Sequence, residues 1–267
     1  MNCTALILAA GRGERMRPLT DHTPKPLLQV RGKPLMQWAM EGLTKGGFIE
    51  LVVNTAWLGE QVANHFGRHS KLHFGKKPAY LLPKVLLKSE QIEGGPITVN
   101  ISYSHEGRDF GGALETAGGI VRALPLLCRS EADEVFWVLA GDVFAPDFVF
   151  SQDAVDRFKA SGKLAHLWLV PNPEHNTKGD FGLQADGLVV NDASAKYTFS
   201  TIALYRKSLF SLPYCDIPVG NPDGIKAALA PLLRKAIAAQ QVSGELYTGT
   251  WTDVGTPERL SQINHQQ

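Results

Sequence analysis

The sequence predicts an α/β protein with a mixed, mostly parallel, Rossmann-like sheet flanked by helices. Two observations lead to this prediction. Short apolar runs alternate with segments of helical periodicity as far as Val170, and this alternation is typical of βαβ units with parallel strands and right-handed crossovers. The first apolar run ends in a turn of small residues, Ala9 to Gly13, and such sheets bind ligands at turns of this kind.

The expected strands and helices follow one another in the order that this fold requires. The short apolar runs predict strands, and the longer amphipathic segments between them predict helices. Strands are expected over Thr4–Ala9, Glu50–Asn54, Thr98–Ser104, Val135–Ala140 and Leu164–Val170, and helices over Pro34–Lys45, Leu58–Phe66, Glu115–Leu124 and Ala154–Ala160.

The section after Pro171 has a different pattern. Phe181–Leu183 and Leu188–Val190 flank the turn Ala185-Asp186-Gly187, which is typical of a β-hairpin. The remaining expected elements are a strand over Tyr197–Tyr205, a helix near Gly224–Ala239, a strand over Leu246–Trp251 and a terminal helix from Pro257. The two halves of the chain are therefore expected to share one sheet.

Composition and charge narrow the class of protein. Of the 267 residues, 44% are hydrophobic and 20% charged, as in an ordinary globular protein. The formal net charge of +1 gives no general attraction for nucleic acid. Cys3, Cys128 and Cys215 are far apart and odd in number, which favours thiols in a reducing compartment. No apolar run approaches the ~20 residues of a membrane span, and Met1–Ala10 does not resemble a signal peptide. We expect a cytoplasmic protein without nucleic-acid or membrane partners.

The segment from Leu8 to Leu27 carries the strongest functional signal. Gly11 and Gly13 allow backbone N–H groups to approach a polyanion closely, and Arg15 and Lys25 supply fixed cations. A proline stands on each side of Lys25 and stiffens its backbone, so that its ammonium group is held in place. We interpret this segment as a triphosphate site at the carboxyl end of the first strand.

Two other phosphate-binding motifs do not fit this segment. The Gly-Lys-Ser/Thr of a Walker loop is absent, and Met16 occupies the third glycine position of a dinucleotide fingerprint. A dinucleotide site would also need an acidic residue at the end of the second strand, where this chain has Asn54.

Two aspartates next to predicted strands are candidates for a metal site. Asp142 follows the strand Val135–Ala140 after Gly141, and Asp253 precedes Gly255 and the terminal helix. A carboxylate in either position can hold Mg²⁺ against phosphate oxygens. Either can equally be an ordinary turn or helix-capping residue.

Several motifs together resemble those of the sugar-1-phosphate nucleotidyltransferases. Leu8–Thr20 and Pro24-Lys25-Pro26 are similar to the signature of that family. Leu114–Gly119, Gly141-Asp142-Val143 and Trp251–Leu260 resemble its second nucleotide loop, its metal-binding strand end and its closing motif. The resemblance implies the nucleotide-diphospho-sugar transferase fold. It also implies a reaction in which a sugar 1-phosphate attacks the α-phosphorus of a nucleoside triphosphate and pyrophosphate leaves.

The resemblance also implies roles for individual residues. Lys25 and Arg15 would be catalytic, and Asp142 and Asp253 would share one Mg²⁺. The expected nucleotide-binding residues are Ala10, Gly11, Arg12, Gly13, Ser104, Glu115, Thr116 and Gly118, and the expected sugar-binding residues are Asn172, Gly182 and Thr201.

The resemblance spans nearly the whole chain and implies a single domain over residues 1–267. Residues 1–145 would form a nucleotide-binding half with an insertion at 67–96, and residues 146–267 a sugar-binding half. The lysine-rich insertion is either a solvated surface loop or a cationic flap over the substrate. Because the chain stops at Gln267, we expect no C-terminal β-helix of the kind that some relatives carry, and a monomer or weak dimer.

Further segments bear on the substrates. Asn54–Gly59, Gly179-Asp180-Phe181 and Val242–Tyr247 are similar to compact family members that use UTP and N-acetylmuramate 1-phosphate in cell-wall peptidoglycan recycling. Ala140 is a departure, since those members have asparagine before the Gly-Asp pair. Guanylyl transfer to mannose 1-phosphate, thymidylyl or uridylyl transfer to glucose 1-phosphate, and a non-catalytic nucleotide-sugar sensing module remain alternatives.

Overall fold

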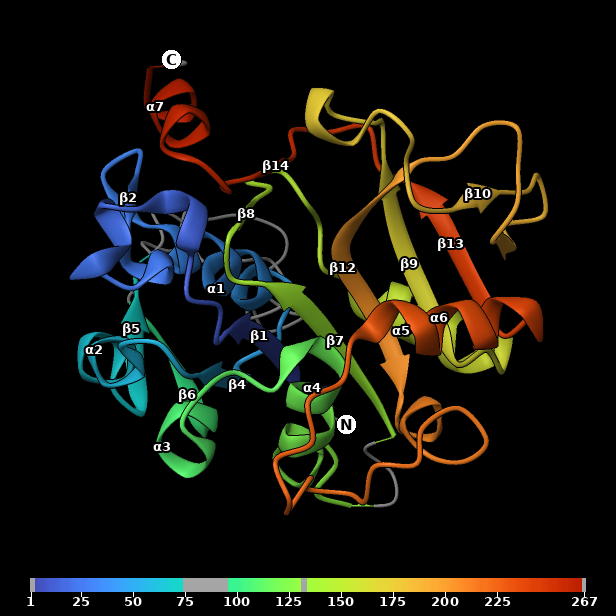
Figure 1. The fold of residues 1–267 in the computed structure, drawn as a ribbon, viewed down its shortest axis with the longest axis horizontal. Helices are drawn as coiled ribbons and strands as arrows, with labels where there is room; N and C mark the ends of the chain where they lie inside the picture. Colours follow the sequence, from blue (N-terminus) through green and yellow to red (C-terminus); the bar gives the residue numbers. More distant parts are fainter. Residues whose placement is uncertain (1–2, 74–95, 131–133, 266–267) are drawn as a thin grey trace, which may run out of the picture.

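An eight-stranded sheet runs through the molecule (Figure 1). The computed structural model describes residues 3–73, 96–130 and 134–265. The strands lie in the order β13-β9-β12-β7-β1-β4-β6-β5. Their bounds are β1 (Ala5–Ala9), β4 (Glu50–Thr55), β5 (His69–Leu72), β6 (Ile97–His105), β7 (Val135–Ala140), β9 (Ala165–Val170), β12 (Thr198–Arg206) and β13 (Val242–Leu246).

The directions of the strands confirm a mixed, mostly parallel sheet. Strands β7, β1, β4 and β6 are parallel neighbours at its centre, and β13 is parallel to β9. Strand β12 is antiparallel to both of its neighbours, and β5 is antiparallel to β6. Since parallel strands end at the same edge of a sheet, the turns after β1, β4, β6 and β7 lie close together.

Helices cover both faces of this sheet. Side chains of β1 alternate between the two faces, with Ala5 and Ile7 on one side and Leu6 on the other. Helices α1 and α5 pack on the first side, and α4 and α6 on the second. The helices are α1 (Leu35–Lys45), α2 (Gly59–Phe66), α3 (Glu106–Phe110), α4 (Glu115–Leu127), α5 (Gln152–Ser161), α6 (Leu229–Ala238) and α7 (Pro257–His265).

Within the described residues there are also three short strand pairs and five short segments of 3₁₀-helix. The pairs are β2 (Gln29–Val30) with β3 (Lys33–Pro34), β8 (Val143–Phe144) with β14 (Thr252–Asp253), and β10 (Gly182–Leu183) with β11 (Val189–Val190). The 3₁₀ turns are Glu14–Met16, Leu19–Asp21, Lys25–Leu27, Glu174–Asn176 and Lys207–Phe210. The β10–β11 pair confirms the predicted hairpin.

The predicted strand Leu246–Trp251 is wrong. Strand β13 ends at Leu246, and residues 247–251 form a loop. Tyr247 and Trp251 pack against the core from this loop, and the Trp251 indole Nε1 donates a hydrogen bond of 3.1 Å to the Ser200 carbonyl. Because these two residues pack against the core, the segment has an apolar pattern although it forms no strand. The predicted helix near Gly224–Ala239 is shorter than expected, because α6 begins at Leu229.

Only part of the predicted insertion at 67–96 lies within the described residues. Residues 69–72 form the edge strand β5, so the insertion begins as part of the sheet. The two interpretations of the insertion, a surface loop or a cationic flap, concern residues 74–95, which lie outside the described residues.

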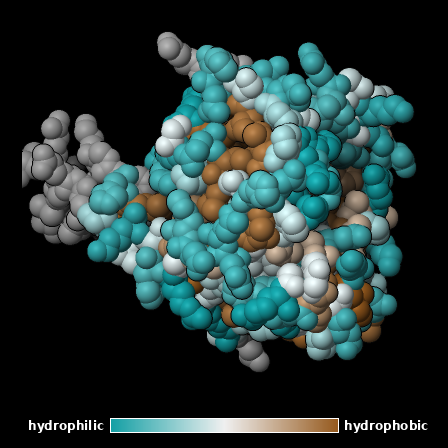
Figure 2. Space-filling model, turned by 60° about the vertical axis from the view of Figure 1, so that its left-hand side comes forward, coloured by the Kyte–Doolittle hydropathy of each residue, from teal (hydrophilic) through white to brown (hydrophobic). Residues whose placement is uncertain are grey.

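Figure 2 shows a mostly hydrophilic face with a group of hydrophobic residues near its centre. Scattered apolar side chains are normal on a protein surface. None of the helices in the described part of the chain is long and apolar enough to cross a membrane.

Candidate active site

A cavity of about 670 Å³ lies at the carboxyl ends of β1 and β7. Its lining comes from both halves of the chain, from the first turn at Ala10 and Gly11 to α6. The structure places seven of the predicted site residues in this lining: Ala10, Gly11, Lys25, Glu115, Thr116, Asp142 and Thr201. Residues more than 100 positions apart in sequence thus share one cavity.

Side-chain contacts hold the loop after β1, which belongs to the signature segment Leu8–Thr20 and is called the signature loop below. Gly13 has a φ of 70°, a left-handed conformation that favours glycine, and the Thr20 hydroxyl donates a 2.8 Å hydrogen bond to its carbonyl. The guanidinium of Arg12 lies over the Trp57 ring, 3.7 Å from the centroid. The Trp57 indole donates a 2.9 Å hydrogen bond to the Thr20 carbonyl. Trp57, which was not predicted, therefore ties the turn after β4 to the signature loop.

Lys25 and Asp142 form an ion pair at the wall of the cavity. Lys25 begins a 3₁₀ turn between Pro24 and Pro26 and is only 9% exposed. Asp142 follows β7, whose neighbour is β1. Because Lys25 is buried and the prolines on either side fix its backbone, its ammonium group stays at the cavity rather than in solvent.

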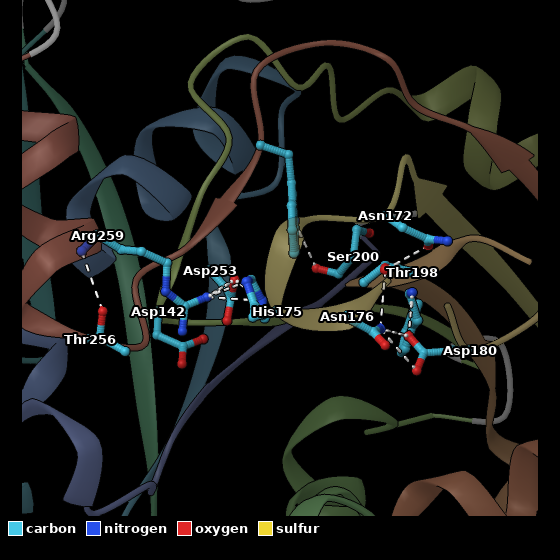
Figure 3. Close-up of polar contacts among 12 residues, drawn as sticks. Asp142, Asn172, His175, Asn176, Asp180, Thr198, Ser200, Asp253, Thr256 and Arg259 are labelled. Atoms are coloured by element: carbon cyan, nitrogen blue, oxygen red, sulfur yellow. Dashed lines mark hydrogen bonds and ion pairs between the residues drawn. The ribbon is translucent and has the colours of Figure 1, made fainter. Parts of the chain in front are cut away.

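Asp253 lies beside Asp142 because β14 pairs with β8 (Figure 3). Asp253 stands opposite Val143, and the Val254 amide donates a 2.8 Å hydrogen bond to the Asp142 carbonyl. The Asp253 carboxylate forms an ion pair with Arg259, and the His175 Nε2 lies 3.0 Å from one of its oxygens. Both aspartates therefore face cationic or hydrogen-bonding partners.

Two neighbouring carboxylates fit a Mg²⁺ site. Magnesium in nucleotide enzymes takes one or two protein carboxylates together with substrate phosphates. Among the described residues there is no group of three or more histidine, cysteine, aspartate or glutamate side chains suited to a metal. One or two carboxylates form a donor set of the kind that substrate phosphates complete.

A buried hydrogen-bond network joins the turns after β1 and β6. The Ala9 amide donates to the Asn54 side-chain oxygen at 2.7 Å, and the Asn54 amide group donates to Glu106 at 2.7 Å. The other Glu106 oxygen accepts a 2.8 Å hydrogen bond from the Leu114 amide. Burial raises the pKa of the Glu106 carboxyl, while the Leu114 and Asn54 hydrogen bonds lower it. Asn54 and Glu106 both line the cavity, and neither was predicted as a site residue.

The predicted second nucleotide loop opens α4. Glu115 has a φ of 58°, which is strained for a residue with a side chain. Gly118 does not line the cavity, and a Cβ there would lie only 2.4 Å from the Ile225 carbonyl. Packing within the protein thus accounts for this glycine, and its contact with a nucleotide stays a prediction.

Two hydroxyls from β12, those of Thr201 and Tyr205, lie in the cavity lining. Thr201 lies where the register of β12 shifts and has a φ of 64°, which is unusual for a β-branched residue. The buried Thr201 Oγ1 and Tyr205 hydroxyl have no hydrogen-bond partner within the described residues. Burial raises the pKa of the Tyr205 hydroxyl, which therefore stays protonated. A ligand that filled the cavity would supply the missing partners.

Asn172 and Gly182 do not line the cavity. The Asn172 side chain accepts a 2.9 Å hydrogen bond from the Thr198 hydroxyl and donates one of 2.9 Å to the Lys196 carbonyl (Figure 3). A Cβ on Gly182 would lie 2.4 Å from that of Ala193. Both residues hold the local backbone, and their sugar contacts stay predictions.

The remaining predicted residues do not line the cavity; they are Arg12, Gly13, Arg15, Ser104 and Asp253. Arg15 is exposed, and its Nη2 lies 3.2 Å from the place that a Cβ on Gly255 would occupy, so its guanidinium is beside the turn after Asp253. Ser104 is buried in β6 opposite Asn54.

Comparisons with known proteins agree with this geometry. The sequence model of the nucleotidyl transferase family matches residues 4–188. The chain is 42% identical over 266 residues to an N-acetylmuramate alpha-1-phosphate uridylyltransferase of Neisseria meningitidis serogroup B, covering 97% of this chain and 95% of that protein. A protein of the same name from Caulobacter vibrioides is 29% identical, with coverage of 95% and 92%. A mannose-1-phosphate guanylyltransferase catalytic subunit beta of Drosophila pseudoobscura is 28% identical and matches over 59% of its length.

The fold also has a solved counterpart. A crystal structure from Bacillus anthracis, assigned as a glucose-1-phosphate thymidylyltransferase, superposes with a TM-score of 0.68 at 18% identity, covering 98% of this chain and 94% of that one. This similarity confirms the predicted nucleotide-sugar transferase fold.

Proposed function

The chain belongs to the nucleotidyl transferase family, and on that premise we propose that it transfers a uridylyl group from UTP to N-acetylmuramate 1-phosphate. The products are the UDP-sugar and pyrophosphate. Similarity over the full length of an enzyme of that name supports the choice of substrates. One structural observation carries the proposal furthest. A single cavity has the signature glycine loop, Lys25 and Asp142 at one end, and an apolar wall with orphan hydroxyls at the other.

The reaction needs positioning and charge neutralisation more than proton transfer. A phosphate monoester has a second pKa of about 6, so the attacking sugar phosphate is largely dianionic near neutral pH. Its oxygen forms a bond to the α-phosphorus, and the bond from that phosphorus to the bridging oxygen breaks. Pyrophosphate leaves with the electron pair. No side chain has to remove a proton from the nucleophile, so the protein must bring two polyanions together.

Named residues meet this requirement. The backbone amides of the turn from Gly11 to Gly13 would bind the triphosphate, as the close approach of a glycine loop allows. The Lys25 ammonium, held between two prolines at the cavity wall, would bridge the attacking phosphate and the α-phosphate. Arg15 would neutralise the departing pyrophosphate. Fixed cations of this kind act mainly on the transition state.

Asp142 and Asp253 would hold the Mg²⁺, which supplies further neutralisation of phosphate charge when bound. Lys25 on Asp142, and Arg259 with His175 on Asp253, keep the two carboxylates in place. We further propose that residues 1–145 serve the nucleotide and residues 146–267 the sugar. The protein would act in the cytoplasm, in peptidoglycan recycling, as a monomer or weak dimer.

A pyrophosphate-release screen tests this proposal. UTP, dTTP, GTP and CTP are each combined with N-acetylmuramate, N-acetylglucosamine, glucose and mannose 1-phosphates in the presence of Mg²⁺. We expect the highest kcat/KM for UTP with N-acetylmuramate 1-phosphate. A higher value for GTP with mannose 1-phosphate, or for a glucose 1-phosphate pair, would replace the proposed substrates. Nucleotide binding without turnover of any pair would favour a sensing module instead.

A further inference from the structure

The sugar end of the cavity contains one cation. Among the described residues that line the cavity, the cationic side chains are Lys25 and Arg234. Lys25 belongs to the phosphate end and is paired with Asp142. Arg234 lies on α6 beside Leu233 and Leu229, in a wall that is otherwise largely apolar. Under the proposed function the phosphates bind beside Lys25 and the glycine loop, which leaves Arg234 for another group of the substrate.

The side chain of Arg234 is exposed, lines the cavity and lies near one of its aromatic residues. Its guanidinium carbon lies 5.4 Å from the centroid of the Phe181 ring, and Phe181 itself lines the cavity. A cation–π contact of this kind favours a guanidinium that lies across the wall. No carboxylate within the described residues forms an ion pair with it; the carboxylate of Asp180, which shares the cavity lining, accepts a 2.8 Å hydrogen bond from the Phe199 amide.

We propose that Arg234 binds a carboxylate carried by the sugar substrate and so selects an acidic sugar 1-phosphate. The inference rests on the proposed function, because N-acetylmuramate differs from N-acetylglucosamine by a lactyl ether that ends in a carboxylate. A guanidinium binds a carboxylate through two parallel hydrogen bonds, which a neutral sugar cannot form. The aliphatic side chains around Arg234 would pack against the methyl group of the same lactyl ether.

The test compares three variants of α6. Arg234→Gln removes the charge, Arg234→Lys keeps it without the two-pronged geometry, and Lys235→Gln changes the exposed neighbour, which does not line the cavity. For each we measure the KM for UTP, the KM for N-acetylmuramate 1-phosphate, and the inhibition constant of N-acetylglucosamine 1-phosphate as a competitor of that substrate. The competitor carries the same phosphate and lacks the carboxylate.

We expect Arg234→Gln to raise the KM for N-acetylmuramate 1-phosphate by roughly tenfold or more, as for loss of a charge-assisted hydrogen bond. The KM for UTP and the inhibition constant of the competitor should stay within about twofold, because neither UTP nor the competitor carries the carboxylate whose contact is lost. Arg234→Lys should show a smaller rise, and Lys235→Gln none.

Two results would overturn the assignment while leaving the proposed function intact. One is an unchanged KM for N-acetylmuramate 1-phosphate in Arg234→Gln. The other is an equal weakening of both sugar phosphates, which would mean that Arg234 contacts a shared group or acts through the fold. A wild-type protein that does not turn over N-acetylmuramate 1-phosphate would overturn the proposed function and this inference together, before any variant is made.

Discussion

The proposed phosphate end and the proposed sugar end of the cavity are built by different means. At the phosphate end, polar groups are already paired: Lys25 with Asp142, and Asn54 with Ala9 and Glu106. At the sugar end, the Thr201 and Tyr205 hydroxyls have no partner within the described residues. A paired site is organised before the substrate arrives, and an orphan hydroxyl gains its partner from the substrate. The phosphate end should therefore serve every substrate, and the sugar end should distinguish among sugars.

The largest effect that follows from this comparison is expected for Asp142→Asn. The change removes one of the two neighbouring carboxylates, so the Mg²⁺-dependent rate should be lost with every sugar 1-phosphate. Pyrophosphate release as a function of Mg²⁺ concentration measures it, with the exposed Asp216→Asn as control. If the variant kept both its rate and its response to Mg²⁺, Asp142 would not be a metal ligand.

Lys25→Ala should reduce kcat/KM by about 10²-fold or more, as for the loss of a fixed cation that acts on the transition state. The reduction should be the same for all sugar 1-phosphates, because under the proposed function Lys25 contacts phosphate groups that all of them share. Steady-state kinetics with two sugars checks both statements, and the exposed Lys45→Ala is the matched control. Near-normal turnover would remove Lys25 from the mechanism.

Glu106→Gln tests whether the buried network organises the phosphate end. Both Glu106 oxygens accept hydrogen bonds, so a glutamine NH₂ must face a donor. We expect a loss of about 1–3 kcal/mol in the free energy of unfolding. The KM for UTP should rise with any sugar. Exposed Glu60→Gln serves as control.

The same variant should show a particular pH dependence. Because the folded-state pKa of Glu106 is raised above its ordinary value of 4.5, its contribution to stability is complete below that value and declines as the pH rises through the folded pKa. The advantage of the wild type over Glu106→Gln should therefore narrow as the pH is raised above 4.5 in urea denaturation. A gap that widened over this range would contradict the raised pKa.

The smallest effect is expected for Thr201→Val, which keeps the shape of the side chain and removes its hydroxyl. The free protein should be unchanged or more stable, since Thr201 Oγ1 is buried without a partner in the described structure. If the hydroxyl binds the sugar, the KM for the sugar 1-phosphate should rise by roughly fivefold, about the value of one hydrogen bond. The KM for UTP should not change. Thr201→Ser should retain the wild-type KM, and a variant with unaltered sugar kinetics would exclude this contact.

The sequence was informative where one site is built from a contiguous segment. The turn from Ala10 to Gly13 and the Pro-Lys-Pro at Lys25 lie close together in sequence, and their spacing predicted a site at the end of β1, where the cavity lies. The longer strands and helices of the first 170 residues were also predicted nearly to their ends, because each has a strong apolar pattern of its own, whereas the short elements β5 and α3 were not predicted.

The sugar end could not be predicted in the same way. Tyr205 and Arg234 come from a strand and a helix whose patterns are those of ordinary core elements, and only the fold brings them to one cavity. His175 was not predicted as a site residue for a similar reason, since it is 78 residues from Asp253 in sequence. One feature of the sequence could have identified Glu106 as a site residue. Like Asp142, it is a carboxylate just after a predicted strand.

The network from Ala9 through Asn54 and Glu106 to Leu114 also bears on how the protein folds. Ala9 and Asn54 are 45 residues apart along the chain, and Asn54 and Glu106 are 52 residues apart. The network therefore cannot form until β1, β4 and β6 have come together. Closing such loops is slow, because their entropy is lost before the contacts form. The phosphate end should therefore be among the later parts of the molecule to assemble. Once formed, it should open only together with the centre of the sheet, and the Ala9 and Leu114 amide hydrogens should exchange with solvent as slowly as those of the core strands.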